Sequence, residues 1–260
     1  MRTAYFAKHS ITRIVYNKRL SMNNPLTDQE QRRYKYHLLL EEIGIQGQEK
    51  IKNTKILVVG AGGIGSPALQ YLTASGFGHI GIIDFDQVTE SNLQRQILYG
   101  GSDLGKLKSI VAKQKLEQMN TMIDYKVFNI KITRENASRF IKDFDIIIDA
   151  TDNYEAKYLL NDVCVELNKI FIFGAIYKFE GQVGVFNYKN GPQLRDAFPE
   201  QPVQTTEETG ILGIIPGIIG LFQVNEAIKI ATGIGENLSG KLLIFNAINN
   251  DFQLINIKKK

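Results

Sequence analysis

From Lys55 onward, continuous apolar runs alternate with stretches in which apolar residues recur at helical spacing. Continuous apolar runs are typical of parallel strands buried on both faces, and the stretches between them are typical of covering helices. The predicted strands are 56–59, 80–83, 125–130, 145–149 and 170–173, and the predicted helices are 65–75, 106–119, 134–141 and 154–167. The alternation therefore predicts β-α-β units around a parallel sheet.

The pattern is different on both sides of this region. The flanking elements are predicted as a helix over 27–41, antiparallel strands in 181–187 and 241–257, a helix over 218–231, and a long loop over 189–210. Thr27 or Asp28 would cap the first helix. We expect an α/β protein with a Rossmann-like, doubly wound, mostly parallel sheet and antiparallel C-terminal strands.

The start of the chain differs in composition from the rest. Several basic residues and no acidic residue precede Asp28. This resembles an organellar presequence, but an upstream start codon with Met22 as the true beginning is the interpretation we favour, and with it a cytoplasmic location. We expect residues 1–26 to form a flexible extension and residues 27–260 to form a single domain.

Composition excludes several classes of function. The net charge of +4 does not by itself indicate nucleic-acid binding, which would need a clustered basic face, and we expect no nucleic-acid partner. The longest apolar run, 211–222, is interrupted by glycine and proline and is shorter than the roughly 20 residues that span a membrane. Cys164 is the only cysteine, which rules out an internal disulfide and a cysteine-based zinc site.

A glycine-rich turn follows the first predicted strand. Gly60, Gly62 and Gly65 form a Gly-x-Gly-x-x-Gly pattern between this strand and a helix, with Gly63 inside it. Such a turn lets the backbone approach a ligand, and the helix N-terminus offers free N–H groups to an anion. Asp84 ends the next strand, where a carboxylate usually holds a ribose hydroxyl. The sequence therefore predicts a nucleotide site.

The residues after Asp84 favour a triphosphate over a dinucleotide. Basic and polar side chains follow at Asp86, Asn92, Arg95, Gln96 and Lys108. A dinucleotide enzyme has no need of converging cations there, whereas negative charge must be neutralised before a carboxylate can attack phosphorus.

A further predicted strand ends in carboxylates. Asp149, Asp152 and Asn153 stand where the strand should meet the ligand crevice, and a carboxylate there could hold Mg²⁺ against phosphates. The alternative is that Asp149 and Asp152 merely cap the next helix. The presence of two such carboxylates at the same sheet edge as Asp84 favours a functional role over simple helix capping.

The chain resembles the ThiF/MoeB/HesA family, which is related to the ubiquitin-activating enzymes, from about residue 33 to residue 252. The matching motifs are Gly44 with Gly47-Gln48, and residues 59–67, 91–96, 149–153, 179–183 and 210–213. The resemblance implies MgATP and adenylation of the Gly-Gly tail of a small ubiquitin-like sulfur carrier, giving an acyl-adenylate. It also implies a homodimer, for which 211–221 could supply packing.

The resemblance also implies roles for the candidate residues. Asp84 would hold the ribose, Asn92, Arg95 and Lys108 would contact phosphates, and Asp152 would take Mg²⁺. Alignment and charge neutralisation would supply the catalysis, because the substrate provides its own nucleophile.

Three departures from the family pattern matter. Gln193 and Asp196 stand where a first zinc-binding Cys-x-x-Cys pair is usual, so no zinc site is expected. The 202–210 stretch holds no cysteine that could bond to a carrier, and Cys164 is interpreted as packing. Tyr36 stands in place of an arginine that reaches ATP in the partner subunit, so Arg32, Arg33 or Lys35 substitutes or ATP binds more weakly.

These departures leave other functions open. One is a peptide-modifying adenylase, and another is a non-catalytic nucleotide-binding relative. An NAD-dependent oxidoreductase is the third alternative.

Overall fold

The computed structural model describes residues 25–203 and 209–260. The expected extension over 1–26 lies almost wholly outside these ranges and stays a prediction. One eight-stranded sheet runs through the molecule in the order β3-β2-β1-β4-β5-β6-β7-β8. The first five strands pair in parallel, and β6, β7 and β8 continue the sheet antiparallel. The expected fold class is therefore confirmed.

The strands are short and lie close to their predicted positions. They are β1 (Lys55–Val59), β2 (His79–Ile83), β3 (Asp124–Phe128), β4 (Ile146–Asp149), β5 (Ile170–Tyr177), β6 (Glu180–Phe186), β7 (Lys241–Asn246) and β8 (Asp251–Asn256). The α-helices are α1 (Asp28–Arg33), α2 (Lys35–Leu38), α3 (Gly44–Asn53), α4 (Gly65–Ser75), α5 (Lys108–Met119), α6 (Ala137–Ile141), α7 (Tyr154–Glu166), α8 (Leu194–Ala197) and α9 (Ile214–Thr232). Two 3-10 turns, η1 (Glu90–Asn92) and η2 (Gly101–Asp103), lie between β2 and α5.

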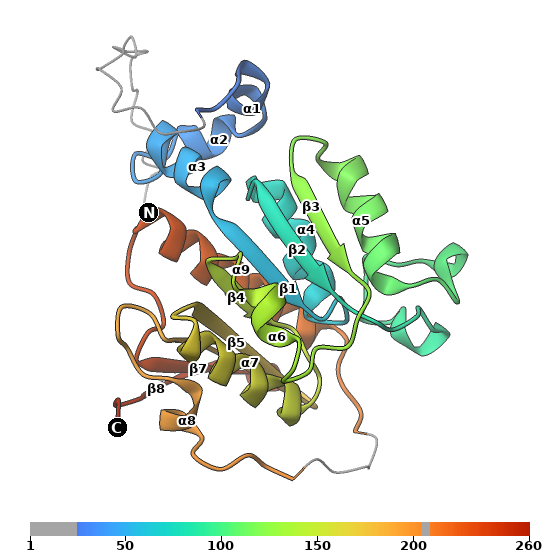
Figure 1. Ribbon diagram of the computed structural model, residues 1–260, viewed down its shortest axis with the longest axis vertical. Helices are drawn as coiled ribbons and strands as arrows, with labels where there is room; N and C mark the ends of the chain where they lie inside the picture. Colours follow the sequence, from blue (N-terminus) through green and yellow to red (C-terminus); the bar gives the residue numbers. More distant parts are fainter. Residues whose placement is uncertain (1–24, 204–208) are drawn as a thin grey trace, which may run out of the picture.

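Helices cover both faces of the parallel strands (Figure 1). Successive side chains of a strand point to opposite faces, so Ile56 and Val58 pack with α4, α5 and α9, and Leu57 and Val59 pack with α6 and α7. Both sets are buried. This two-sided burial explains why the strands are continuous apolar runs.

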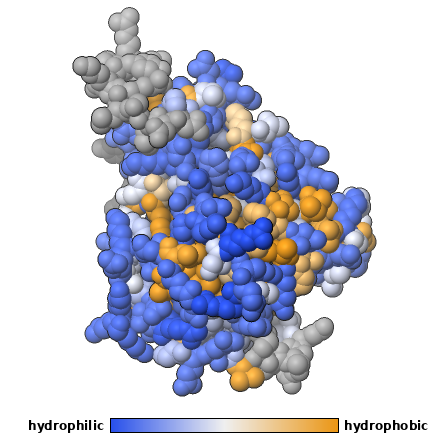
Figure 2. Space-filling model, in the orientation of Figure 1, coloured by the Kyte–Doolittle hydropathy of each residue, from blue (hydrophilic) through white to orange (hydrophobic). Residues whose placement is uncertain are grey.

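The two helical layers differ in character. Figure 2 shows the side of α6 and α7, where the surface is mostly hydrophilic with smaller apolar patches. On the other side, α9 is long and apolar enough to cross a membrane by length and composition alone. It packs against α3, α4, β5 and β6, however, and core helices commonly meet the same criterion.

The expected helix over 27–41 is wrong, because the chain forms two short helices there. Thr27 caps α1 as expected, in a capping box with Glu30. The break lies at Tyr34, which is buried and whose hydroxyl accepts a hydrogen bond from Asn120 Nδ2 at 2.9 Å. This tertiary contact outweighs the local helical pattern.

Helix α3 has no counterpart among the predicted elements. Its buried face carries polar side chains, among them Gln48, whose Nε2 donates to the backbone oxygen of Ser75 at 2.8 Å. A buried polar face leaves no apolar periodicity to detect.

The C-terminal third also differs in its element bounds. Helix α9 begins at Ile214 rather than at 218, because Pro216 lies in its first turn, where the missing N–H is tolerated. Residues 241–257 form two strands, β7 and β8, and the expected loop over 189–210 contains the short helix α8.

Candidate nucleotide site

The glycine turn joins β1 to α4 in a conformation that requires glycine. Gly60 has φ +96°, and a side chain there would meet the backbone oxygen of Ala150. A side chain at Gly65 would meet the oxygen of Gly60. The turn is therefore pressed against the end of β4, and Gly62 and Gly63 are left partly exposed above it.

Asp84 fastens this turn to the end of β2. Its carboxylate accepts hydrogen bonds from Ala61 N at 2.7 Å and Asp86 N at 2.9 Å. Burial raises the pKa of the Asp84 carboxyl, although the two N–H donors act in the opposite sense. A desolvated carboxylate thus sits beside the glycine turn, at the end of β2.

Gln96 and Tyr99 lie behind the turn. The Tyr99 hydroxyl donates to Ala61 O at 2.8 Å, which fixes the turn from below. Gln96 is buried beside Gly62, and its Oε1 has no hydrogen-bond partner among residues 25–203 and 209–260. Buried polar atoms are nearly always satisfied, so an orphaned acceptor beside the glycine cradle fits a bound polar ligand.

Cationic side chains lie on the same edge of the sheet. Lys108 is buried, and its Nζ pairs with the Asp86 carboxylate at 3.2 Å. Arg95 is half-buried and donates to Ser91 O at 3.0 Å, with its Cδ alongside Gly63. Both groups are held by the protein, and both fit a polyphosphate bound at the turn.

Asn92 and Asn153 each make a local backbone contact. Asn92 Oδ1 accepts a hydrogen bond from Thr89 N at 3.3 Å. Asn153 caps α7, with its Oδ1 accepting from Ala156 N at 2.8 Å. The Nδ2 of Asn153 lies 3.3 Å from an oxygen of Asp152, whose carboxylate is exposed.

Asp149 is neither a ligand-facing carboxylate nor a helix cap, which corrects both interpretations of it. The residue is fully buried, and its carboxylate pairs with Lys157 Nζ at 3.0 Å. Its other oxygen accepts a hydrogen bond from the Thr151 hydroxyl at 2.7 Å. Both oxygens are therefore engaged within the protein.

Lys157 is the important residue that sequence reasoning missed. Its Nζ also donates to Thr151 O at 2.8 Å and to Gly174 O at 2.6 Å, and it lies over the Phe173 ring at 5.5 Å. The detectable signal is a lysine between Ala156 and Tyr158 on the buried face of a helix. This ammonium joins α7, β4 and β5 beneath the loop that carries Asp152.

The sheet brings the predicted residues to one edge. Val59 is aligned with Ile83 on one side and with Asp149 on the other. The chain segments that follow these three positions therefore leave the sheet together at its carboxyl edge, which in doubly wound sheets is the ligand-binding edge.

The N-terminal residues lie elsewhere. Figure 1 shows α1 and α2 at the opposite end of β1 from this edge. Tyr36 is 78% exposed, and Arg33 donates to Met119 O at 2.6 Å. Within one chain, the structure does not bring Tyr36 or Arg33 to the glycine turn.

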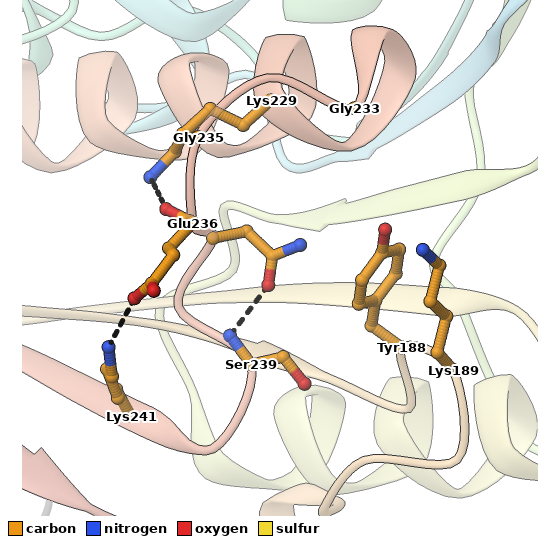
Figure 3. Close-up of a pocket in the computed structure, with 9 residues that line it drawn as sticks. Tyr188, Lys189, Lys229, Gly233, Gly235, Glu236, Ser239 and Lys241 are labelled. Atoms are coloured by element: carbon orange, nitrogen blue, oxygen red, sulfur yellow. Dashed lines mark hydrogen bonds and ion pairs between the residues drawn. The ribbon is translucent and has the colours of Figure 1, made fainter.

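Two other concavities lie away from this edge. A cavity of about 340 Å³ lies beyond the end of α9 (Figure 3), where Lys229 donates to Glu236 O at 2.9 Å and Lys241 pairs with the Glu236 carboxylate at 3.1 Å. Its lysines thus hold a surface turn. A cavity of about 640 Å³ lies at the amino ends of β1, β2 and β3.

The family model described as "ThiF family" matches residues 34–260, which include every element of this edge. The chain belongs to the ThiF family. The resemblance expected from the motifs is thus confirmed.

Curated relatives match most of this chain. It is 48% identical over 234 residues to a "Probable molybdopterin-synthase adenylyltransferase" of Porphyra purpurea, covering 88% of this chain and 61% of that protein. It is 38% identical over 242 residues to a "Sulfur carrier protein adenylyltransferase" of Thermus thermophilus, covering 90% of this chain and 89% of that one. The chain therefore spans less than two thirds of the Porphyra relative and most of the Thermus relative.

Solved structures share the fold at lower identity. Escherichia coli MccB with MccA-N7isoASN superposes with a TM-score of 0.80 at 21% identity, covering 88% of this chain and 72% of that chain. The structure of PaaA superposes with a TM-score of 0.79 at 22% identity, covering 94% of this chain and 79% of that chain. These similarities show the fold.

The Lys157→Met substitution tests the buried ion pair. We expect a loss of about 3–5 kcal/mol in the free energy of unfolding, because the buried Asp149 carboxylate is left without its counter-ion. Lys241→Met is the control, because its pair with Glu236 is largely exposed and such pairs contribute about 1 kcal/mol or less. Equal urea midpoints for the two variants would contradict this role.

Proposed function

We propose that the protein is an ATP-dependent adenylyltransferase. It activates the C-terminal carboxylate of a small ubiquitin-like sulfur-carrier protein with a Gly-Gly tail, for molybdopterin or thiamine sulfur transfer. One observation supports this most: the ribose-type carboxylate Asp84 and the cations Arg95 and Lys108 surround a single glycine turn. The names of the Porphyra and Thermus relatives support the same reaction.

The site suits an in-line attack on phosphorus. The carrier carboxylate oxygen forms a bond to the α-phosphorus, and the bond from that phosphorus to the pyrophosphate oxygen breaks. Arg95 and Lys108 offset the charge that develops, and the glycine turn aligns the phosphates. Asp152 would hold Mg²⁺, which supplies further charge neutralisation on the phosphates when bound.

No protein nucleophile is needed for this step. Cys164 is buried on α7, and burial raises the pKa of its thiol. A buried, protonated thiol is a poor nucleophile. The proposal therefore covers adenylation and includes no covalent sulfur relay on Cys164.

Pyrophosphate exchange tests the reaction directly. The protein should exchange labelled pyrophosphate into ATP when it is mixed with Mg²⁺ and a Gly-Gly-tailed carrier. Arg95→Ala, Lys108→Ala and Asp152→Asn should each lower the exchange rate by on the order of a hundredfold or more, because the first two remove a cation at the phosphates and the third removes the carboxylate that would hold Mg²⁺.

Lys106→Ala is the matched control for these variants. Its ammonium lies 3.8 Å from Asp103 and is largely exposed, so we expect near-normal exchange. Absence of exchange by the unaltered protein with carriers of both the molybdopterin and the thiazole type would refute the proposal. Exchange supported by a short peptide instead would favour a peptide-modifying adenylase.

The raised pKa of Asp84 gives a pH prediction. The folded protein takes up this proton at a higher pH than the unfolded chain, so Asp84 stabilises the fold most below the ordinary value of 3.8. That contribution to the free energy of unfolding is lost as the pH rises through the raised pKa. At neutral pH the ionised Asp84 carboxylate therefore lowers the stability of the fold. Ribose binding needs the ionised form, in which both oxygens accept hydrogen bonds.

Adenosine affinity should therefore fall as the pH is lowered towards 3.8, beginning above that value. Calorimetric titration with adenosine measures this without interference from phosphate titration. Asp84→Asn should bind weakly at every pH. A wild-type affinity that is constant across this range would contradict the role of Asp84.

We also propose that the protein acts as a homodimer through α9 and β8. Less than half of the apolar helix α9 is buried, and its Leu221 is 38% exposed. Phe252 and Leu254 on the edge strand β8 are 57% and 59% exposed, and the Phe252 ring contacts Phe222 of α9 at 6.0 Å. Exposed apolar side chains that gather on a helix and the adjoining edge strand are typical of an interface.

Leu221→Glu combined with Leu254→Glu should convert the dimer to a monomer in sedimentation experiments, because both charges would be buried at the interface. Ile110→Glu on α5 is the control. Ile110 is an exposed apolar residue too, at 42%, but it lies on another helix. A wild-type protein that sediments as a monomer would remove the basis for this proposal.

A further inference from the structure

The sheet divides between β4 and β5 beside the candidate nucleotide site. The ladder that joins the two strands ends at Ile148 and Ile172, and from Phe173 onward β5 pairs with β6 alone. Strand β4 ends at Asp149, where the loop that carries Asp152 begins. A fork therefore opens in the sheet at the base of this loop, and we refer to it as the β4–β5 fork.

Side chains from both faces of the sheet reach into the β4–β5 fork. Helices α7 and α9 cover opposite faces of the sheet (Figure 1). From α7, Lys157 Nζ donates to Gly174 O at 2.6 Å. From α9, Gln223 Nε2 donates to Asp149 O at 2.7 Å and to Ile172 O at 3.1 Å. One amide group thus bridges the two strands where their ladder has ended.

The Gln223 amide fits the fork in one orientation. The residue is fully buried, and a side chain at Gly174 would lie 2.4 Å from its Nε2, so only glycine leaves room for the amide. Turning the amide over would place its Oε1 against two carbonyl oxygens, which cannot donate a hydrogen bond.

This orientation leaves the Gln223 oxygen unsatisfied. Its Oε1 has no hydrogen-bond partner in the described parts of the chain, residues 25–203 and 209–260. A buried acceptor without a partner lowers stability and offsets much of what the two Nε2 hydrogen bonds contribute. The geometry that Gln223 fixes therefore explains its presence better than stability does.

Helix α9 also contacts the glycine turn. A side chain at Gly63 would meet the Pro216 ring, and a side chain at Gly220 would meet the backbone oxygen of Ile64 at 2.5 Å. Gln223 follows Gly220 by three residues, which is about one turn of the helix. One helix thus contacts the glycine turn and the β4–β5 fork at neighbouring points.

We propose that Gln223 is a positioning residue for the metal-binding loop of the adenylation site. It holds the backbone of Asp149 from the α9 side and so sets the position of Asp152 relative to the glycine turn. Asp152 would hold Mg²⁺, and altering the groups behind a metal ligand commonly changes metal affinity about ten- to hundredfold. The inference rests on the proposed adenylation and adds a residue that touches neither the nucleotide nor the metal.

Gln223→Met tests this role, because methionine is also unbranched and lacks the two N–H donors. The affinity for ATP in the presence of Mg²⁺ should fall by about tenfold, since the loop that would hold the metal loses its support. The affinity for adenosine should be unchanged, because adenosine has no phosphate to share with Mg²⁺. Calorimetric titrations without a carrier measure both affinities in the absence of turnover.

Thr232→Val is the matched control on the same helix. Thr232 is buried at the end of α9, and its hydroxyl donates to Ile228 O at 2.7 Å. This variant also loses a side-chain hydrogen bond to a backbone oxygen, so its urea midpoint should fall while both affinities stay unchanged. A Gln223→Met protein that behaves in the same way would have lost stability alone, and the positioning role would be overturned.

A double-mutant cycle shows whether Gln223 acts through the metal-binding loop. In an Asp152→Asn background, Gln223→Met should cause no further loss of affinity for ATP with Mg²⁺, because both substitutions impair the same metal contact. Losses that multiply would place the effect of Gln223 elsewhere and contradict the inference.

Gly174→Ala provides a second variant should Gln223→Met fail to fold. The added methyl group would displace the Gln223 amide without removing it. Affinity for ATP with Mg²⁺ should again fall while affinity for adenosine is kept. Equal losses for the two ligands would argue against a role confined to the metal-binding loop.

Pyrophosphate exchange separates this inference from the proposed function. Absence of exchange by the wild-type protein with any carrier would refute adenylation, whereas a loss confined to ATP with Mg²⁺ in Gln223→Met would still establish the positioning role. Where exchange occurs, Gln223→Met should raise the Mg²⁺ concentration for half-maximal exchange by about tenfold and leave the carrier KM unchanged. A wild-type affinity for ATP that does not depend on Mg²⁺ would overturn the inference, since the loop would have no metal to position.

Discussion

The buried ion pair between Asp149 and Lys157 is the constraint on which the rest of the candidate site depends. Removing two charges from water is expensive, and the pair is tolerable because every partner position is filled. The Lys157 ammonium has the Asp149 carboxylate and the backbone oxygens of Thr151 and Gly174 around it. One cation thus ties the start of α7 to the end of β4 and the middle of β5.

This arrangement determines what the neighbouring carboxylate can do. Thr151 is held through its hydroxyl, its N–H and its carbonyl oxygen, all by the same pair. Asn153 then caps α7, so Asp152 is left between two fixed residues with its carboxylate exposed. In the proposed reaction Asp152 would hold Mg²⁺, which needs a carboxylate that is oriented without being neutralised, and a rigid backbone on both sides meets that requirement.

The parallel half of the sheet could be predicted from the sequence because each strand is buried on both faces. Runs such as 56–59 and 80–83 carry enough apolar residues to be detected without any tertiary information. Where a buried surface is polar, as in α3, or a buried side chain breaks a helix, as at Tyr34, the pattern fails. Those features depend on partners distant in the chain, such as Ser75 and Asn120.

In the candidate site too, features that depend on local sequence could be predicted, and features that depend on distant partners could not. Gly60 and Asp84 are recognisable because their roles depend on local strand-turn geometry. The roles of Asp149 and Asp152 could not be distinguished from the sequence, since both stand near the end of one strand and burial alone separates them. Lys157 was missed because an isolated lysine in a helix is ordinarily solvated, and its partners come from three elements.

Lys108 also forms an ion pair, but the environment of its partner differs from that of the Lys157 pair. Lys108 is almost as buried as Lys157, but its partner Asp86 has a side chain that is 50% exposed. An exposed carboxylate can rotate towards water at little cost, whereas Asp149 cannot leave its counter-ion. In the proposed reaction, Lys108 would be held in position before a phosphate arrives and be shared with it afterwards, whereas Lys157 stays with the scaffold. Burial of the partner, more than burial of the cation, separates the structural lysine from the one available to a ligand.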